Sequence, residues 1–308
     1  MFPPVFVLAA VAVGTVPGAA VLASAQWPYR SPAAAIVLWQ ALGLSWGLAA
    51  VGALAGLGAV PGRYGVAGGA LSGASQALRD ARLGFDALSS LARLAVLAAS
   101  AALLALLCWV LVAATAAVVV ARRRHRALLS LLAHGDPKVP GALVVDHPAA
   151  AAYCVPGLRS QIVISAGTLD LLDQAELAAG LAHERAHLRA RHDLVLLPFC
   201  ALARAFPRSP LVRRAHARVA LLVEMLADDQ ALRQRPAREL ATALLRVGVS
   251  GAGQAPCGAM SAADSEVVTR VTRLLTPPAR LPVTTQALIC SAAAVLVAVP
   301  VTLLVFTF

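Results

Sequence analysis

Charged residues are scarce in this chain: they make up 13% of the 308 residues, whereas hydrophobic residues make up 59%. The mean hydropathy of +0.77 lies well outside the range of a soluble globular domain. This shortage of charge excludes an ordinary soluble protein and predicts a chain that lies in a lipid bilayer.

The apolar residues are gathered in long runs. Runs that can cross the roughly 30 Å of bilayer hydrocarbon occupy residues 3–25, 33–60, 94–121 and 283–308. We therefore expect an α-helical membrane protein with three transmembrane helices in residues 1–121, which include an extracytoplasmic amphipathic loop at 61–93. Residues 122–282 form an inserted domain of ordinary size, and residues 283–308 form a fourth transmembrane helix.

The basic residues predict the orientation. An arginine-rich run, residues 122–126, directly follows the third apolar run and is the strongest positive-inside signal. It predicts that the inserted domain is cytoplasmic, although arginines in the 61–93 loop weigh the other way. The first run could instead be a cleaved signal peptide, but residues 1–4 carry no positive charge, which favours an uncleaved span.

The outer loop contains one periodic feature. Apolar residues recur three and four positions apart between residues 71 and 88, at Leu71, Ala74, Leu78, Ala81, Phe85 and Leu88. This spacing predicts an amphipathic helix on the outer membrane surface. Such a helix is either a plain interfacial helix or an element that docks a sensor partner.

Two kinds of motif are missing. The five cysteines show no C-x-x-C spacing, and a cytoplasmic domain keeps its thiols reduced, so neither a cysteine-zinc site nor a disulfide is expected. No DNA-binding motif accompanies the net charge of +11. The arginines are typical of a surface facing anionic lipid, and we expect no direct contact with nucleic acid.

An H-E-x-x-H motif in the inserted domain carries the chemistry. On a predicted helix over residues 172–193, His183 and His187 share one face, where their imidazoles can hold one Zn²⁺. Glu184 is then placed to take a proton from the attacking water as the catalytic base. The alternative is a solvated polar helix face, because most residues around the motif are hydrophilic.

A catalytic zinc needs a third protein ligand. Glu224 is the best candidate, because an isolated carboxylate in the apolar run 221–227 would otherwise be costly. Asp228 follows one turn later and could orient a zinc-binding imidazole. His192 is expected to point about 140° away from His187 on the same helix, and His216 is interpreted as part of a solvated basic face.

Residues 161–165 precede the motif helix and are rich in β-branched side chains, which predicts a strand. Zinc peptidases commonly bind a substrate as an added strand. We therefore consider a substrate-binding role for this segment beside the equally plausible role of a core strand. Its candidate substrate-binding residues are Ile162, Val163, Ile164 and Ser165.

Together, H-E-x-x-H and the downstream E-x-x-x-D of Glu224 and Asp228 resemble a signature shared by membrane-integral HtpX proteases, CAAX prenyl proteases and BlaR/MecR sensor-transducer peptidases. The strand, the motif helix and a following Arg-His-Asp, which ends at Asp193, look most like the BlaR/MecR group. The layout of three spans before the peptidase domain and one after also resembles that group. The resemblance implies a zincin-like (gluzincin) α+β metalloprotease domain, with Asp193 as a further residue that orients a ligand.

The resemblance also implies a function. We expect a short form of the family that lacks the C-terminal sensor domain, because the chain has no S-x-x-K motif for β-lactam sensing. A regulatory zinc endopeptidase that cleaves a cytoplasmic protein, such as a BlaI-like repressor, is the leading hypothesis. The alternatives are an HtpX-like quality-control protease and a non-catalytic signalling scaffold. Tyr153, His216 and Arg218 remain open as oxyanion donors.

Overall fold

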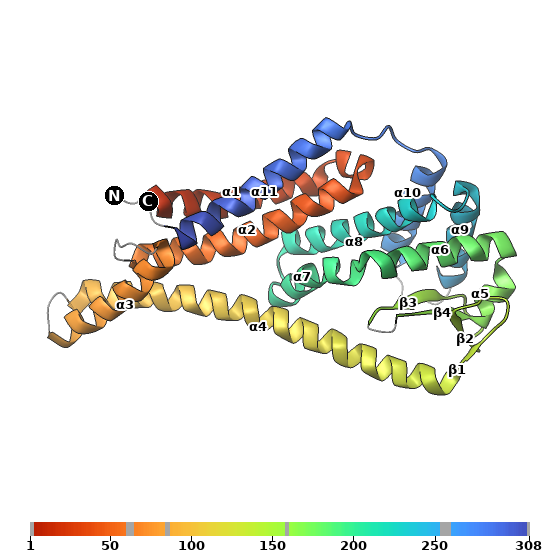
Figure 1. The fold of residues 1–308 in the computed structure, drawn as a ribbon, viewed down its shortest axis with the longest axis horizontal. Helices are drawn as coiled ribbons and strands as arrows, with labels where there is room; N and C mark the ends of the chain where they lie inside the picture. Colours follow the sequence, from red (N-terminus) through yellow and green to blue (C-terminus); the bar gives the residue numbers. More distant parts are fainter. Residues whose placement is uncertain (1–2, 60–64, 84–86, 158–159, 253–259, 307–308) are drawn as a thin grey trace. The chain divides into compact units, whose positions relative to one another are not determined.

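The computed structural model describes residues 3–59, 65–83, 87–157, 160–252 and 260–306 (Figure 1). The described chain is mostly helical and divides into two compact units. The first unit consists of Met1–Val112, Leu202–Ala215 and Leu281–Phe308. The second unit consists of Ala113–Ala201 and His216–Arg280, so it contains most of the predicted inserted domain.

The first unit is built from long apolar helices. They are α1 (Pro3–Ser24), α2 (Pro32–Gly58), the first part of α4 (Ala87–Leu132) and α11 (Val283–Val305), with a short 3-10 helix η1 (Trp27–Arg30) between α1 and α2. Within the described residues, 4 helices are long and apolar enough to cross a membrane, and each overlaps one of the four predicted runs. The prediction of four apolar helices is therefore confirmed.

Helix α2 lies at the centre of this unit, because small residues let its neighbours approach closely. A Cβ atom added at Gly52 would lie 2.9 Å from a methyl carbon of Leu304 on α11 and 3.0 Å from one of Leu8 on α1. The Ser45 hydroxyl, also on α2, donates a hydrogen bond of 2.8 Å to the carbonyl of Leu296 on α11. Tight packing and a polar contact between helices thus both join α2 to α11.

The segment predicted as an amphipathic outer loop contains α3 (Gly65–Leu83) and the start of α4. Leu71 and Leu78 of the predicted stripe lie in α3, and Leu88 lies in α4; all three are exposed. Phe85 lies outside the described residues. The location of this segment outside the cytoplasm stays a prediction.

A small sheet follows the last part of α4 in the second unit. Strands β1 (Ala133–Gly135), β2 (Ala142–Val145), β3 (Ala152–Val155) and β4 (Gln161–Ser165) are arranged in the order β1-β2-β4-β3. Strands β2 and β4 are parallel, and the two outer strands pair antiparallel to them. The strand predicted at residues 161–165 is confirmed as β4.

The position of β4 corrects the predicted substrate-binding role of Ile162, Val163, Ile164 and Ser165. Strand β4 lies between β2 and β3, so the backbone groups on both of its edges are already hydrogen-bonded. The Ser165 hydroxyl is also used locally, because it accepts a hydrogen bond from the Thr168 amide as the N-cap of α5 (Ala166–Leu171). These residues form a core strand, and the free edge on this side of the sheet belongs to β3.

The two faces of the sheet carry different neighbours. On one face, Leu129 of α4 packs with Val155 and Val163. On the other, Leu181 packs with Val144 and Ile164. Leu181 belongs to α6 (Gln174–Ala190), the helix that carries the H-E-x-x-H motif. The motif helix is therefore held against the sheet by its apolar flank.

Helix α6 has clear signals at both ends. The Asp173 carboxylate accepts hydrogen bonds from the amides of Ala175 and Glu176, and the Glu176 side chain accepts one from the Asp173 amide, which is a capping box worth about 1 kcal/mol. At the other end, Arg191 has a left-handed backbone with φ 50°. The chain turns there and continues as α7 (His192–Ala205).

Three further helices complete the second unit: α8 (Pro210–Ala231), α9 (Ala237–Ala252) and α10 (Met260–Leu275). The part of α8 from His216 onward belongs to this unit. A buried apolar cluster joins α6, α8, α9 and α10 through Ala179, Ala182, Ala231, Leu240, Ala241, Val271 and Leu274. This cluster brings polar side chains from α6, α8 and α10 to one place.

Candidate metal centre

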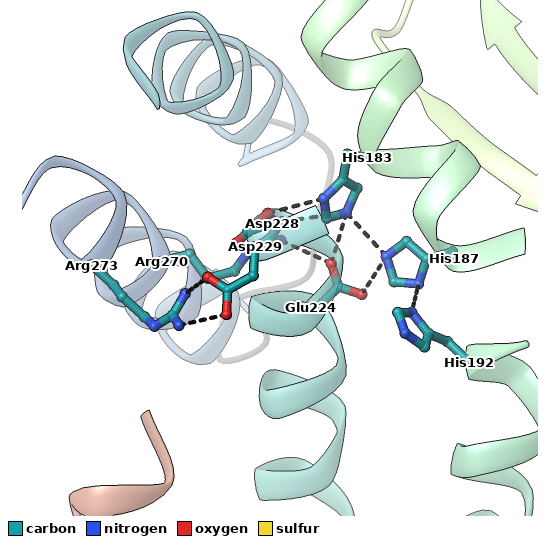
Figure 2. Close-up of polar contacts among 8 residues, drawn as sticks. All are labelled: His183, His187, His192, Glu224, Asp228, Asp229, Arg270 and Arg273. Atoms are coloured by element: carbon teal, nitrogen blue, oxygen red, sulfur yellow. Dashed lines mark hydrogen bonds and ion pairs between the residues drawn. The ribbon is translucent and has the colours of Figure 1, made fainter. Parts of the chain in front are cut away.

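The two histidines of the motif converge with one carboxylate. The Nε2 atoms of His183 and His187 are 3.0 Å apart on α6. Helix α8 brings Glu224 to the same point, with Oε2 3.3 Å from His183 Nε2 and Oε1 3.6 Å from His187 Nε2. Figure 2 shows the three side chains pointing toward one another from two helices.

These separations fit a zinc ion. Ligand atoms at about 2.0–2.1 Å from zinc in a tetrahedron lie about 3.3 Å from one another. The two imidazole nitrogens are 3.0 Å apart, and they lie 3.3 and 3.6 Å from the two oxygens of the same carboxylate, which is close to that value. Two imidazole nitrogens and one carboxylate oxygen also form a common set for catalytic zinc, which leaves the fourth position open for water. Donor chemistry and geometry therefore both suit Zn²⁺.

Asp228 lies behind the first histidine. Its Oδ1 atom is 2.9 Å from the Nδ1 atom of His183, on the opposite side of the ring from the convergence point. Burial opposes the imidazolium, but the carboxylates of Asp228 and Glu224 outweigh this effect and raise the pKa of His183 to about 9. Without a metal, His183 is therefore protonated at neutral pH, and a metal ion must displace that proton.

The second histidine has a neighbour that sequence reasoning placed wrongly. The Nδ1 atom of His192 lies 3.0 Å from the Nδ1 atom of His187 (Figure 2). The expectation that His192 points away rested on one continuous helix, but α6 ends at Ala190 and the left-handed Arg191 turns the chain back. His192 is buried, and burial together with the charge of His187 lowers its pKa to about 4. A neutral imidazole therefore faces the back of His187.

Arg270 was not identified from the sequence. On α10, it is buried and donates two hydrogen bonds to Asp228, from Nε at 2.9 Å and from a terminal nitrogen at 2.7 Å. Its other terminal nitrogen is 3.0 Å from Glu224 Oε2. Its position in the sequence could have identified it. Arg270 lies among Val267, Val271 and Leu274 on the apolar face of a helix, where a charge needs a buried partner.

The guanidinium of Arg270 and the two motif histidines keep the carboxylates ionised. Burial disfavours the charged form of Glu224, but hydrogen bonds from His183 and His187 and the charge of Arg270 outweigh it, so the pKa of Glu224 lies well below its usual range. The pKa of Asp228 is likewise lowered, because its bonds to Arg270 and His183 outweigh its burial. Both groups therefore carry the negative charge that attracts a cation.

Glu184 follows the first histidine on α6 and is half-buried. Burial raises the pKa of its carboxyl group, and the nearby charge of Glu224 raises it further, although His183 and His187 act in the opposite direction. A carboxylate with a raised pKa is a stronger base than an exposed one. The environment of Glu184 thus suits a group that accepts and returns a proton.

Other residues singled out in the sequence lie in different contacts. The Asp193 carboxylate is 3.0 Å from Arg122, and its predicted role in orienting a ligand stays a prediction. The hydroxyl of Tyr153, one of the possible oxyanion donors, is 2.9 Å from Nε2 of His125 on α4. His216 has its Nε2 atom 3.3 Å from the Cys200 sulfur.

Comparison with known protein families gives independent support for a metallopeptidase. The family model described as Peptidase family M48 matches residues 118–218. The match covers the end of α4, the sheet, α6 and the start of α8, so it includes the whole H-E-x-x-H motif. Glu224, Asp228 and Arg270 lie beyond its end. No curated protein and no solved structure matches the chain.

The match supports a metallopeptidase of the M48 family, which agrees with the zinc-compatible geometry. Together with the four apolar helices, it supports a membrane-associated metallopeptidase. The narrower assignment to the BlaR/MecR group goes beyond this match.

Proposed function

We propose that this chain is a zinc-dependent endopeptidase of the gluzincin type that works in a bacterial cytoplasmic membrane. The observation that carries the proposal is the convergence of His183, His187 and Glu224, whose ligand atoms all lie within 4.8 Å of one another. The neighbouring Glu184 supplies the base that a purely structural metal site does not need.

Each residue has a defined role in this proposal. His183, His187 and Glu224 hold one Zn²⁺, which when bound activates water and polarises the scissile carbonyl. The Glu184 carboxylate takes a proton from the attacking water and returns it to the nitrogen of the leaving amine. Asp228, whose Oδ1 atom lies 2.9 Å from Nδ1 of His183, is placed to accept a hydrogen bond from the Nδ1–H group, so that Nε2 of the same ring is free to bind the metal.

The edge of the sheet offers a place for the substrate. Strand β3 pairs only with β4 in the described sheet, and it packs beside α6. An extended peptide could add to this edge through backbone hydrogen bonds, which hold a peptide of any sequence. We assign the substrate-binding role that β4 cannot perform to β3.

The proposed substrate is a cytoplasmic protein. The arginine run at residues 122–126 supports a cytoplasmic position for the domain at 122–282, with the 61–93 segment outside the cytoplasm. By analogy with the BlaR/MecR group, a BlaI-like repressor is the first candidate, with an outer sensor partner as the source of the signal. A quality-control protease of the HtpX kind would instead cleave many damaged membrane proteins.

An isosteric substitution that removes the negative charge tests the catalytic proposal. The Glu184→Gln variant is expected to bind one Zn²⁺ as the wild type does, while the hydrolysis of fluorescein-labelled casein by the purified full-length protein falls at least about a hundredfold. Arg185→Gln is the matched control, because Arg185 is the exposed neighbour on the same helix. Unchanged hydrolysis in Glu184→Gln would remove the catalytic assignment and favour a scaffold.

The substrate class needs a separate experiment in cells. We expect quantitative proteomics to find one or a few cytoplasmic proteins that accumulate when Glu184→Gln replaces the wild type. Accumulation of many membrane proteins would contradict the regulatory proposal and favour quality control.

A further inference from the structure

The arginine-rich run of α4 divides between two sides of the helix. Arg122, His125 and Arg126 are half-buried, whereas Arg123 and Arg124 are exposed. Residues three and four positions apart lie on the same side of a helix, so the three half-buried residues share one side. The exposed pair can serve the lipid-facing role expected from the sequence, but the other three are directed at the protein.

Two of these inward residues contact β3 and the turn that follows it. The Nε2 atom of His125 lies 2.9 Å from the Tyr153 hydroxyl, and the centres of the two rings are 5.4 Å apart. A terminal nitrogen of Arg126 donates a hydrogen bond of 2.7 Å to the carbonyl of Pro156. A Cβ atom added at Gly157 would collide with the Arg126 guanidinium, so a glycine there leaves room for this bond. The middle and the end of β3 are thus both held by α4.

The same side of α4 makes an apolar contact and an ionic contact. Leu129, seven positions after Arg122, is buried with Val155 and Val163 of the sheet. The Arg122 guanidinium lies 3.0 Å from the carboxylate of Asp193 at the start of α7. Because α4 is continuous with the third apolar run, these contacts join the sheet to a helix that crosses the membrane.

The free edge of β3 lies between the two contacts with α4. The Ala151 carbonyl accepts a hydrogen bond of 2.9 Å from the Ser165 amide of β4. Because bonding alternates along an antiparallel ladder, the backbone groups of Tyr153 also face β4. Those of its two neighbours, Ala152 and Cys154, face the edge that is unpaired in the described sheet. A peptide added there would bond on either side of the residue whose ring α4 holds.

We propose that His125 and Arg126 are positioning residues for the substrate, because they fix the free edge of β3 before a peptide binds. A strand that is paired on one side only opens locally with ease, and ordering it during binding would weaken the affinity. The contacts from α4 remove part of that cost. The role in peptide binding rests on the proposed function, whereas the support of β3 by α4 does not.

The support of β3 can be measured without peptidase activity. Hydrogen–deuterium exchange of the full-length, chelator-treated protein in detergent is followed by mass spectrometry. The double variant Tyr153→Phe/Arg126→Met removes both polar contacts and keeps most of the side-chain volume. We expect the β3 amides that bond to β4 to exchange at least about tenfold faster, because two hydrogen bonds no longer oppose opening.

The run itself supplies the matched control. Arg123→Met removes the same charge from the exposed side of α4, and we expect β3 exchange within about twofold of wild type. Strand β2 is the internal reference, because it lies on the other side of β4. Exchange in β3 that is no faster than in the control would overturn the support of β3. An equal acceleration in β2 would also overturn it, because the contacts would then stabilise the whole sheet.

The role in peptide binding is tested with the same proteins. The double variant is expected to raise KM for labelled casein about three- to tenfold, with kcat and zinc content within about twofold of wild type. The reason is that the edge binds the peptide but carries none of the reacting groups. A wild-type KM, or a loss confined to kcat, would overturn this role. If zinc-loaded wild type hydrolyses neither casein nor any cellular protein, the proposed function fails instead, and the exchange rates still report whether α4 supports β3.

Discussion

Removal of Arg270 is the sharpest test of how the centre is held together without a metal. Its guanidinium joins α10 to two carboxylates of α8, and the Asp228 side chain is 1% exposed. Arg270→Met keeps much of the side-chain volume but leaves the buried Asp228 charge without this partner. Breaking a buried ion pair from one side costs about 3–5 kcal/mol.

The contacts of Asp228 narrow the expected loss of stability. Nδ1 of His183 remains 2.9 Å from Asp228, and the pKa of His183 is about 9, so an imidazolium still faces the carboxylate at pH 7. We therefore expect a loss near 3 kcal/mol at pH 7, which lowers the melting temperature of a protein of this size by about 6–12 °C. Above pH 9 the imidazolium is lost, so the stability difference between wild type and Arg270→Met grows toward about 5 kcal/mol.

The chain contains a matched control. Arg273 lies one turn further along α10 and makes the same two-bond contact with Asp229, at 2.8 and 2.9 Å, but Asp229 is 27% exposed. Arg273→Met is expected to cost no more than about 1 kcal/mol, because water can solvate the carboxylate that remains.

Both variants are compared by circular dichroism during thermal unfolding in detergent with a chelator present, so that a bound metal cannot replace the lost charge. The reasoning is refuted if Arg270→Met unfolds no more easily than Arg273→Met.

Four further predictions concern zinc binding, the stability of the metal-free fold and helix packing. Because zinc must displace the His183 proton, the apparent zinc affinity should rise about tenfold per pH unit from pH 7 to 9 and level off above 9, as measured by chelator competition; a flat profile would contradict the assignment. The raised pKa also means that His183 stabilises the metal-free fold fully below about pH 6.5, and that this contribution disappears as the pH rises through 9. Glu224→Gln should weaken zinc binding by more than the 10–100-fold typical of a residue that only orients a ligand, and wild-type affinity would exclude Glu224 as a ligand. Ser45→Ala removes the bond to the Leu296 carbonyl and should cost about 0.6 kcal/mol in unfolding experiments; a loss above about 2 kcal/mol would show that more than this bond depends on Ser45.

Local sequence patterns predicted the spanning helices well, because the formation of such a helix depends on residues that are close in the sequence. A run of about twenty apolar residues is enough to indicate a spanning helix, and all four runs are long helices in the structure. The third is longer than expected, since α4 continues to Leu132 after the apolar run ends at residue 121. Charged residues continue a helix as readily as apolar ones, so hydropathy marks the end of the apolar run and not the end of the helix.

The candidate metal centre was only partly predictable, because local sequence patterns do not encode contacts between residues that are far apart in the sequence. The spacing of His183 and His187 follows from one helix turn, and Glu224 stood out as a lone carboxylate among apolar residues. Arg270 contacts Asp228 across 42 positions of sequence, and no local period encodes that pairing. The edge position of β3 depended equally on strand order, which the sequence of one strand does not contain.

The left-handed Arg191 also limits how this protein can be altered. A β-branched residue is disfavoured at φ 50°, so substitution with one would favour continuation of α6 into α7 as a single rod. The imidazole of His192 would then swing to the far side of that rod, and the ring of His187 would lose its neighbour. The left-handed backbone of Arg191 thus sets the direction in which α7 leaves α6, and any redesign of the centre has to preserve this turn.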